Sequence, residues 1–154
     1  MAKGEWRLRV SVQRACDSPD LPGKSQVRNW ARAAVAPSTR GGQITVRFVD
    51  SEEGQRLNRD YRARDYATNV LSFPYQQAPL LCGDLVLCAP VVAREATAQD
   101  KSCEAHYAHL IVHGMLHLQG YDHEAGEEEA RDMEDRERRL LAALGFPDPY
   151  REEE

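Results

Sequence analysis

The chain has 154 residues, 42% of them hydrophobic, and a formal net charge of −5. A chain of this length buries about 68–70% of the surface that its unfolded form exposes, so we expect residues 1–154 to form one domain that folds without disulfides. The negative charge gives no support for a general nucleic-acid binder, and no apolar run approaches the roughly 20 residues of a membrane span. The four cysteines form no C-x-x-C pair and no secretory leader is evident, which together predict a cytoplasmic protein with reduced thiols.

Hydrophobic periodicity divides the chain into an early part rich in strands and a later part rich in helices. Strands are expected in four places, of which the last is apolar enough to be central: 6–12, 43–50, 69–75 (ended by Pro74) and 83–89. Helical spacing, with Gly145 and Pro147 as a stop signal, predicts helices at 25–36, 51–62, 90–99, 102–118 and 124–144. This order predicts an α+β fold in which helices cover one sheet of about four strands.

Four of the five histidines fall on the predicted helix 102–118, at His106, His109, His113 and His117. At 100° per residue they lie within roughly 80° of one another and form a stripe. His109 and His117 are about 12 Å apart along the axis, so one zinc ion with bonds of about 2.0–2.1 Å cannot contact both. Two neighbouring histidines, such as His113 and His117, can share an ion, and a third ligand must come from elsewhere.

The segment after this helix supplies a third histidine. Gly120 suits a left-handed cap that ends the helix and turns the chain back, and His123 follows three residues later. Three imidazoles with an open fourth position are typical of a catalytic zinc site, so we predict one zinc ion held by His113, His117 and His123. His109 is the rival ligand. We interpret it as a core or ligand-orienting residue, because choosing it leaves His117 and His123 unexplained.

The residue after the first of these histidines is Gly114. Zinc proteases with similar histidine spacing carry at this position the glutamate that acts as the base of peptide hydrolysis. A glycine inside a helix costs about 0.5–1 kcal/mol relative to alanine, so its presence calls for a compensating benefit. One explanation is room for a bulky, charged substrate at the open position of the metal. The other is tight packing of Gly114 against the sheet.

Three motifs together resemble the YbeY family of bacterial metal-dependent endoribonucleases. They are "HGMLHLQGYDH" at 113–123, "NRDYRARDYATNVLSFPY" at 58–75 and "GDLVLC" at 83–88, and the likeness continues to the closing "LGFPDPY" at 144–150. The resemblance implies an α+β fold with the zinc-bearing helix against a mixed sheet. It also implies cleavage of single-stranded RNA, maturation of the 3′ end of 16S ribosomal RNA, and ribosome quality control, with ribosomal RNA and the small subunit as partners.

Carried over by position, the resemblance places the metal ligands on His113, His117 and His123 and the key arginine on Arg62. By the same analogy, Ser72 and Asp84 shape the floor of the cleft, with a purely structural role as the alternative for both. The family often has aspartate where this chain has Asn69, so no catalytic role is assigned to that position. Asp122, beside His123, is expected to orient a ligand imidazole.

Arg62 also suits the chemistry on physical grounds. Zinc lowers the pKa of a bound water toward about 7 and polarises a phosphoryl oxygen, and a guanidinium binds two phosphate oxygens at once. The alternative for Arg62 is a surface ion pair with Asp60 or Asp65. Further arginines of the basic run 56–64 would extend a track for the RNA backbone, with Tyr61 or Tyr66 as a stacking face: Arg56, Arg59 and Arg64.

The sequence therefore predicts a zinc-dependent endoribonuclease specific for single strands. A metalloprotease is a second hypothesis, weakened by Gly114 and by the lack of a convincing methionine turn. A third hypothesis is a zinc-stabilised ribosome assembly factor whose arginines hold RNA without cutting it. The basic run 56–64 and the acidic run 124–137 are also compatible with ordinary solvated helix faces.

Overall fold

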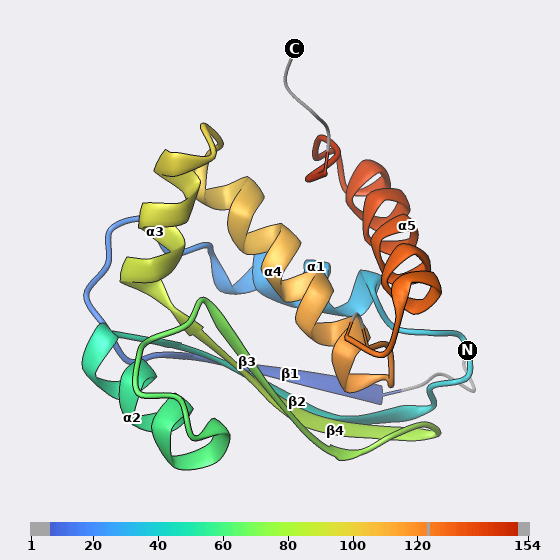
Figure 1. The fold of residues 1–154 in the computed structure, drawn as a ribbon. Coiled ribbons are helices and arrows are strands. Elements are labelled where there is room, and N and C mark those ends of the chain that lie inside the picture. The colour runs from blue at the N-terminus through green and yellow to red at the C-terminus, as the bar shows by residue number, and fades with distance from the viewer. Residues whose placement is uncertain (1–6, 123, 151–154) are drawn as a thin grey trace.

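The computed structural model describes residues 7–122 and 124–150. Over these residues the chain forms four strands and five helices (Figure 1). In chain order they are β1 (Arg7–Arg14), α1 (Lys24–Ala33), β2 (Gly41–Val49), α2 (Ser51–Arg62), β3 (Val70–Gln76), β4 (Leu80–Cys88), α3 (Ala89–Ala98), α4 (Cys103–Leu118) and α5 (Glu127–Ala143). Each expected element is present within a few residues of its predicted bounds, which confirms the α+β fold.

The strands form one mixed sheet in the order β1-β2-β4-β3. β1, β2 and β4 run parallel to one another, whereas β3 pairs antiparallel with β4 and forms an edge of the sheet. The central position predicted for β4 is confirmed. The expectation that Pro74 ends β3 is wrong, because the strand continues to Gln76 with a register shift beyond the proline. An edge strand tolerates a residue without an N–H group, since one side of its backbone needs no strand partner.

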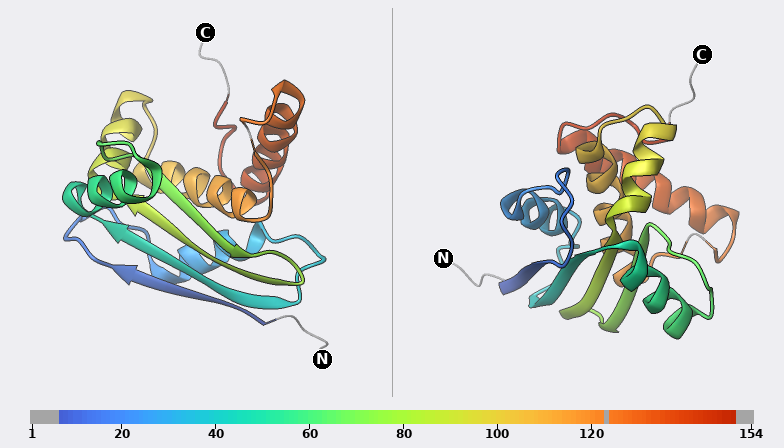
Figure 2. Two further views of the ribbon diagram at one scale, coloured as in Figure 1. Left: turned by 60° about the horizontal axis from the view of Figure 1, so that its bottom comes forward. Right: turned by 90° about the vertical axis from the view of Figure 1, so that its left-hand side faces the viewer.

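Helices α1 and α4 lie on the same face of the sheet, and α5 packs on the far side of α4 (Figures 1 and 2). The main core lies between the sheet and α4, where buried side chains of both layers meet: Ile44, Val46, Phe48, Leu85 and Leu87 from the sheet with Tyr107, Ile111, Met115 and Leu118 from α4. α2 covers only one end of the opposite face, at a smaller buried cluster that includes Leu71, Val86 and Cys88. α4 is therefore the central helix, enclosed by α1, α3, α5 and the sheet.

Two glycines allow α4 to approach the sheet closely. A Cβ atom on Gly114 would lie 2.7 Å from Leu85 Cδ2, and a Cβ atom on Gly83 would lie 2.8 Å from Leu118 Cδ2. Such distances are shorter than any normal carbon–carbon contact, so larger residues would push the two layers apart. The close approach holds the histidines of α4 beside β3, which positions the site.

No helix in the described part of the chain is long and apolar enough to cross a membrane. The structure pairs none of the four cysteines, which all lie among the described residues: Cys16, Cys82, Cys88 and Cys103.

Candidate active site

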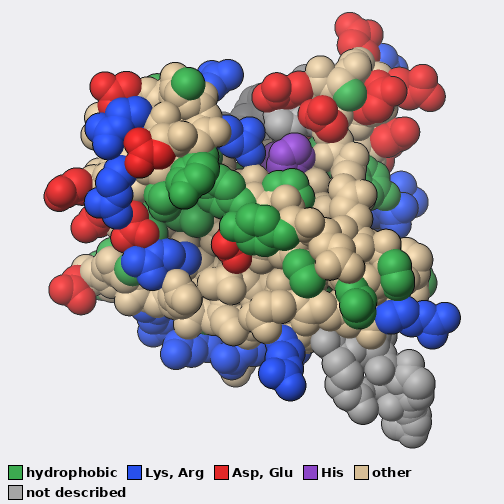
Figure 3. Space-filling view, turned by 90° about the horizontal axis from the view of Figure 1, so that it is seen from below, with side chains coloured by type: hydrophobic (Ala, Val, Ile, Leu, Met, Phe, Trp, Pro, Cys, Tyr) green, Lys and Arg blue, Asp and Glu red, His purple; other side chains and the backbone are tan. Residues whose placement is uncertain are grey.

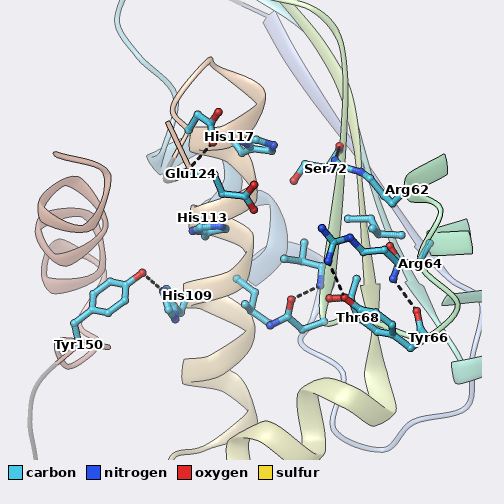
Figure 4. A pocket seen from close by; sticks show the side chains of 16 residues that line it. Arg62, Arg64, Tyr66, Thr68, Ser72, His109, His113, His117, Glu124 and Tyr150 are labelled. Atoms are coloured by element: carbon cyan, nitrogen blue, oxygen red, sulfur yellow. Dashed lines mark hydrogen bonds between the residues drawn. The ribbon is translucent and has the colours of Figure 1, made fainter. Parts of the chain in front are cut away.

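A cleft of about 600 Å³ lies between α4 and the segment that runs from the end of α2 into β3. One wall is α4, which contributes His109, His113 and His117, while Arg62 and Ser72 belong to the opposite wall (Figure 4). α4 begins at Ser102, whose side chain accepts a hydrogen bond from the Ala105 N–H at 3.0 Å. The sequence-predicted histidine pair and the predicted arginine therefore line one cavity.

His113 is oriented by a buried carboxylate on α5. Its Nδ1 atom lies 2.9 Å from Oε2 of Glu137, and Oε1 of the same carboxylate lies 2.7 Å from Nε2 of His109 and 2.6 Å from the hydroxyl of Tyr150. Burial raises the pKa of Glu137, but hydrogen bonds from His109, His113 and Tyr150 lower it by more, to about 2. The carboxylate is thus ionised and can only accept, so in neutral His113 the Nδ1 atom donates and Nε2 carries the lone pair.

His117 reaches the same protonation pattern through a backbone carbonyl. α4 ends at Leu118, and Gly120, just beyond the cap residue Gln119, has a φ of +104°, the left-handed conformation that the sequence predicted. This turn brings the Tyr121 carbonyl oxygen to 3.0 Å from Nδ1 of His117. A carbonyl oxygen only accepts hydrogen bonds, so Nε2 of neutral His117 also carries the lone pair. Both imidazoles therefore have the donor chemistry of zinc ligands, whose other ring nitrogen is normally held by an acceptor.

His123, the predicted third ligand, lies outside the described residues. Among residues 7–122 and 124–150, no three histidine, cysteine, aspartate or glutamate side chains are grouped so that they could hold a metal ion. The side chain of Asp122 accepts a hydrogen bond from the Glu124 N–H at 2.9 Å. The three-histidine centre and the orienting role of Asp122 stay predictions, supported by the donor chemistry of His113 and His117.

The two remaining histidines of the stripe bond through Nε2 to glutamates of different helices, and only His109 lines the cleft. His109 donates from Nε2 to Glu137, which agrees with its interpretation as a ligand-orienting residue. His106 is buried and bonds to Glu95 Oε1 at 2.8 Å through Nε2. Burial lowers the pKa of His106, although Glu95 opposes the shift. The stripe is thus divided between a core part and a part that faces the cleft.

Arg62 is the last residue of α2, and its Nη2 atom donates to the Ser72 carbonyl at 2.9 Å. The ion pairs weighed as alternatives are not formed in the described part of the chain: Asp60 pairs with Arg59, and Asp65 accepts from Gln55. The guanidinium is therefore held against the edge strand by one of its donors. Among the described residues, the guanidinium of Arg62 forms no ion pair with a carboxylate.

The rest of the basic run separates into two groups. Arg64 and Tyr66 line the cleft and bond to each other, with Nη1 of Arg64 3.3 Å from the tyrosine hydroxyl. Arg56 and Arg59 are exposed on α2 and do not line it. Tyr61 contacts Phe73 edge to face, with ring centroids 5.4 Å apart. Within the cleft the basic run is therefore represented by Arg62 and Arg64, and the extension of an RNA track over Arg56 and Arg59 stays a prediction.

Ser72 is among the residues that line the cleft and Asp84 is not, so a role for Asp84 in shaping the cleft floor stays a prediction that this lining does not support. Side chains of a strand alternate between faces. Gly83 faces Leu118 of α4, so Asp84 points to the outer face, where it accepts a hydrogen bond from Tyr75 at 2.8 Å. Figure 3 shows this face, on which hydrophobic side chains gather beside charged ones.

Of the two explanations for Gly114, the structure favours packing. An added Cβ would meet Leu85 of β4 first, and Ser72 Oγ at 3.4 Å only after that. A glutamate in this position could not enter without displacing a fully buried leucine. The absence of the protease base thus follows from the close approach of α4 to the sheet.

The sequence reading missed Glu137 and Tyr150. Glu137 is fully buried and lies four residues after Met133 and four before Leu141, both also buried. A charged residue within an apolar stripe at helical spacing was the available signal, because such a residue is buried only with partners. Tyr150 lies in the closing segment after α5 and offers no comparable periodic signal.

Comparisons with known proteins agree with this arrangement. A family model described as "Endoribonuclease YbeY" matches residues 19–145. The chain is 54% identical over 147 residues to "Endoribonuclease YbeY" of Methylobacillus flagellatus, covering 96% of both chains. It is 57% identical over 147 residues to the protein of the same name from Aromatoleum aromaticum, covering 94% of this chain and 93% of the relative. A solution structure of TM1509 from Thermotoga maritima shares the fold, with a TM-score of 0.57 at 21% identity over 92% of this chain and 99% of the other.

The fold and the cleft define an α+β protein in which imidazoles of one helix and a guanidinium face the same open cavity. These side chains are of the kinds that a hydrolase of phosphate esters uses. The family match makes this class specific. The chain belongs to the YbeY family of endoribonucleases, which confirms the resemblance stated from the sequence motifs.

Proposed function

We propose that this chain is a zinc-dependent endoribonuclease that cuts single-stranded RNA and acts in the maturation of the 3′ end of 16S ribosomal RNA and in ribosome quality control. The observation that carries the proposal is the matched orientation of His113 and His117. Each imidazole has Nδ1 held by an acceptor, so each presents the Nε2 lone pair to a metal ion at a cleft that also contains Arg62. The names of the relatives support the reaction class.

His113, His117 and His123 would hold the zinc ion, which when bound supplies an activated water and polarises a phosphoryl oxygen. The protein holds the two described imidazoles in a fixed orientation before a metal ion binds. Glu137 and the Tyr121 carbonyl fix the two described imidazoles, so neither has to reorient when it binds the ion.

Arg62 would bind the scissile phosphate. One donor is used by the Ser72 carbonyl, which fixes the plane of the guanidinium and leaves its other N–H groups for phosphate oxygens. Negative charge grows on these oxygens as the phosphodiester bond is attacked, and a cation already in place stabilises that charge without reorganisation. Arg64 and Tyr66, at the same wall, would contact the flanking backbone and a base.

The preference for single strands is supported by the size of the cleft. About 600 Å³ lies within the roughly 300–1,000 Å³ typical of small-ligand sites. Such a cavity accepts an unstacked nucleotide, whereas a paired base would first have to leave its helix. The ribosomal substrate, the ribosomal small subunit as partner and a cytoplasmic location belong to the proposal through the family resemblance. Arg59 and Asp84, which do not line the cleft, would contact RNA outside it.

The test uses the purified protein with a single-stranded RNA and a duplex of the same sequence, each with and without a metal chelator. We expect cleavage of the single strand, little cleavage of the duplex, and loss of both with chelator. RNA that is bound with zinc present but never cut would instead support the non-catalytic assembly factor.

A further inference from the structure

We propose that Glu137 and Tyr150 are positioning residues that set the metal affinity of the site. Glu137 orients the imidazole of His113. Tyr150 holds the carboxylate of Glu137 at the rotation angle in which it accepts the hydrogen bond from His113. The inference rests on the proposed function in one respect, that His113 binds the metal. The metal-free protein tests it separately.

The carboxylate of Glu137 is placed where a charge is normally unfavourable. Its side chain is 1% exposed, on the face of α5 that packs against α4. A buried charge is retained only when hydrogen bonds replace the lost water, and removing one partner leaves the others uncompensated. Three donors surround this carboxylate, two of them on α4 and one in the segment after α5. The number of donors is what makes an ionised glutamate stable here.

The three donors also fix which oxygen faces His113. His109 and Tyr150 both bond to Oε1, at 2.7 and 2.6 Å, and His113 bonds to Oε2 at 2.9 Å. Because two donors occupy one oxygen, rotation of the carboxylate would break both bonds at once. His113 therefore meets an acceptor in one fixed place, which determines both the tilt of its ring and the position of its proton.

Tyr150 is itself held by the segment that carries it. Asp148 accepts hydrogen bonds from the Tyr150 N–H at 2.8 Å and from Arg138 at 3.2 Å. The Arg138 guanidinium lies 5.3 Å from the centroid of the Tyr150 ring, and that ring meets His109 edge to face at 5.3 Å. Figure 4 shows the tyrosine hydroxyl directed at His109 from the side opposite the cleft wall formed by β3. The segment after α5 is thus connected to the cleft through one phenol.

The chain offers a matched control for this arrangement. Glu95 bonds to His106 at 2.8 Å, so it is another carboxylate that orients a histidine of α4. His106 lies two helical turns before His113 and does not line the cleft. If Glu137 only stabilised α4, the same change at Glu95 would have a similar effect. If Glu137 positions a ligand, only the change at Glu137 alters metal binding.

The experiment measures zinc dissociation constants, by competition with a chromophoric chelator, for wild type, Glu137→Gln, Tyr150→Phe and Glu95→Gln. We expect zinc binding to weaken about 10–100-fold in Glu137→Gln and about fivefold in Tyr150→Phe, which removes one hydrogen bond to the carboxylate. Glu95→Gln should stay within about twofold of wild type. Equal losses in Glu137→Gln and Glu95→Gln, or wild-type affinity in a folded Glu137→Gln protein, would overturn the proposal.

A second measurement needs neither zinc nor RNA cleavage. Long-range ¹H–¹⁵N spectra of the metal-free protein report which ring nitrogen of His113 carries the proton. We expect it on Nδ1 in wild type and partly on Nε2 in Glu137→Gln. A proton on Nε2 in wild type would refute the positioning role even if Glu137→Gln does not fold. Wild type that shows the expected tautomer but binds no zinc would instead contradict the proposed function.

Discussion

The two walls of the cleft differ in how firmly their functional groups are held. On α4, His113 and His117 are partly buried, and each has one ring nitrogen fixed by an acceptor from another element or from the turn that follows. On the opposite wall, residues 61–66 are exposed, and Arg62 is held by one hydrogen bond to the edge strand. Under the proposed function, the wall that would hold the metal is preorganised and the wall that would hold the phosphate adapts to a flexible chain.

The largest effect should follow from removing a proposed metal ligand. We expect His117→Ala to lower bound zinc from one ion per chain toward none and to abolish RNA cleavage, because two imidazoles retain a zinc ion poorly. Metal analysis of the purified variant measures this directly. His123→Ala should behave in the same way. Undiminished zinc in that variant would remove His123 from the ligand set and make His109 the better candidate.

The adaptable wall is tested by Arg62. If its guanidinium stabilises charge in the transition state, Arg62→Ala should lower the cleavage rate at saturating RNA about 10²–10³-fold, while RNA affinity changes much less. Arg62→Lys keeps the charge but loses the two-pronged geometry, so it should also be slow. Arg59→Ala, on the same helix but outside the cleft, is the control. A normal saturated rate with weakened affinity would make Arg62 a binding residue only.

The rigidity of the α4 wall is tested at Gly114. Gly114→Ala places a methyl group 2.7 Å from Leu85 Cδ2, and overpacking of this kind costs about 1–3 kcal/mol. The better helix propensity of alanine returns about 0.5–1 kcal/mol. We therefore expect a net loss of roughly 1 kcal/mol in the free energy of unfolding, measured with urea. Leu85→Val should reduce the cost of the alanine, and independent effects of the two changes would show that they do not share this contact.

The smallest effect concerns the core part of the histidine stripe. Burial lowers the pKa of His106 below its ordinary 6.5, and its Nδ1 atom is buried without a hydrogen-bond partner among the described residues. The unfolded chain then binds a proton near pH 6.5 that the folded chain binds only at lower pH. The contribution of His106 to stability is therefore complete above pH 6.5 and decreases as the pH falls below it.

Unfolding free energies of wild type and His106→Gln across pH 5–8 check this expectation. Glutamine can still donate to Glu95 but does not titrate, so the pH dependence of the variant should be flatter below pH 6.5. Parallel curves for the two proteins would show that His106 has the same pKa in both states.

The sequence by itself determined most of what lies within one element or one turn. The end of α4 followed from Gly120, because a left-handed turn depends on the neighbouring residues. The spacing of His113 and His117 was sufficient to pair them, since helix geometry fixes their separation. The family followed from three sequence motifs, because their combination in one chain is specific to it.

Contacts between distant elements were decided only by the tertiary structure. The reason for Gly114 depends on Leu85 of β4, and the face on which Asp84 lies depends on which residue of β4 meets α4. The bond between Glu137 and His113 joins residues 24 positions apart on two helices, and no local pattern fixes how those helices face each other. Local geometry is encoded by nearest neighbours, whereas the orientation of a ligand depends on packing that the whole chain must complete.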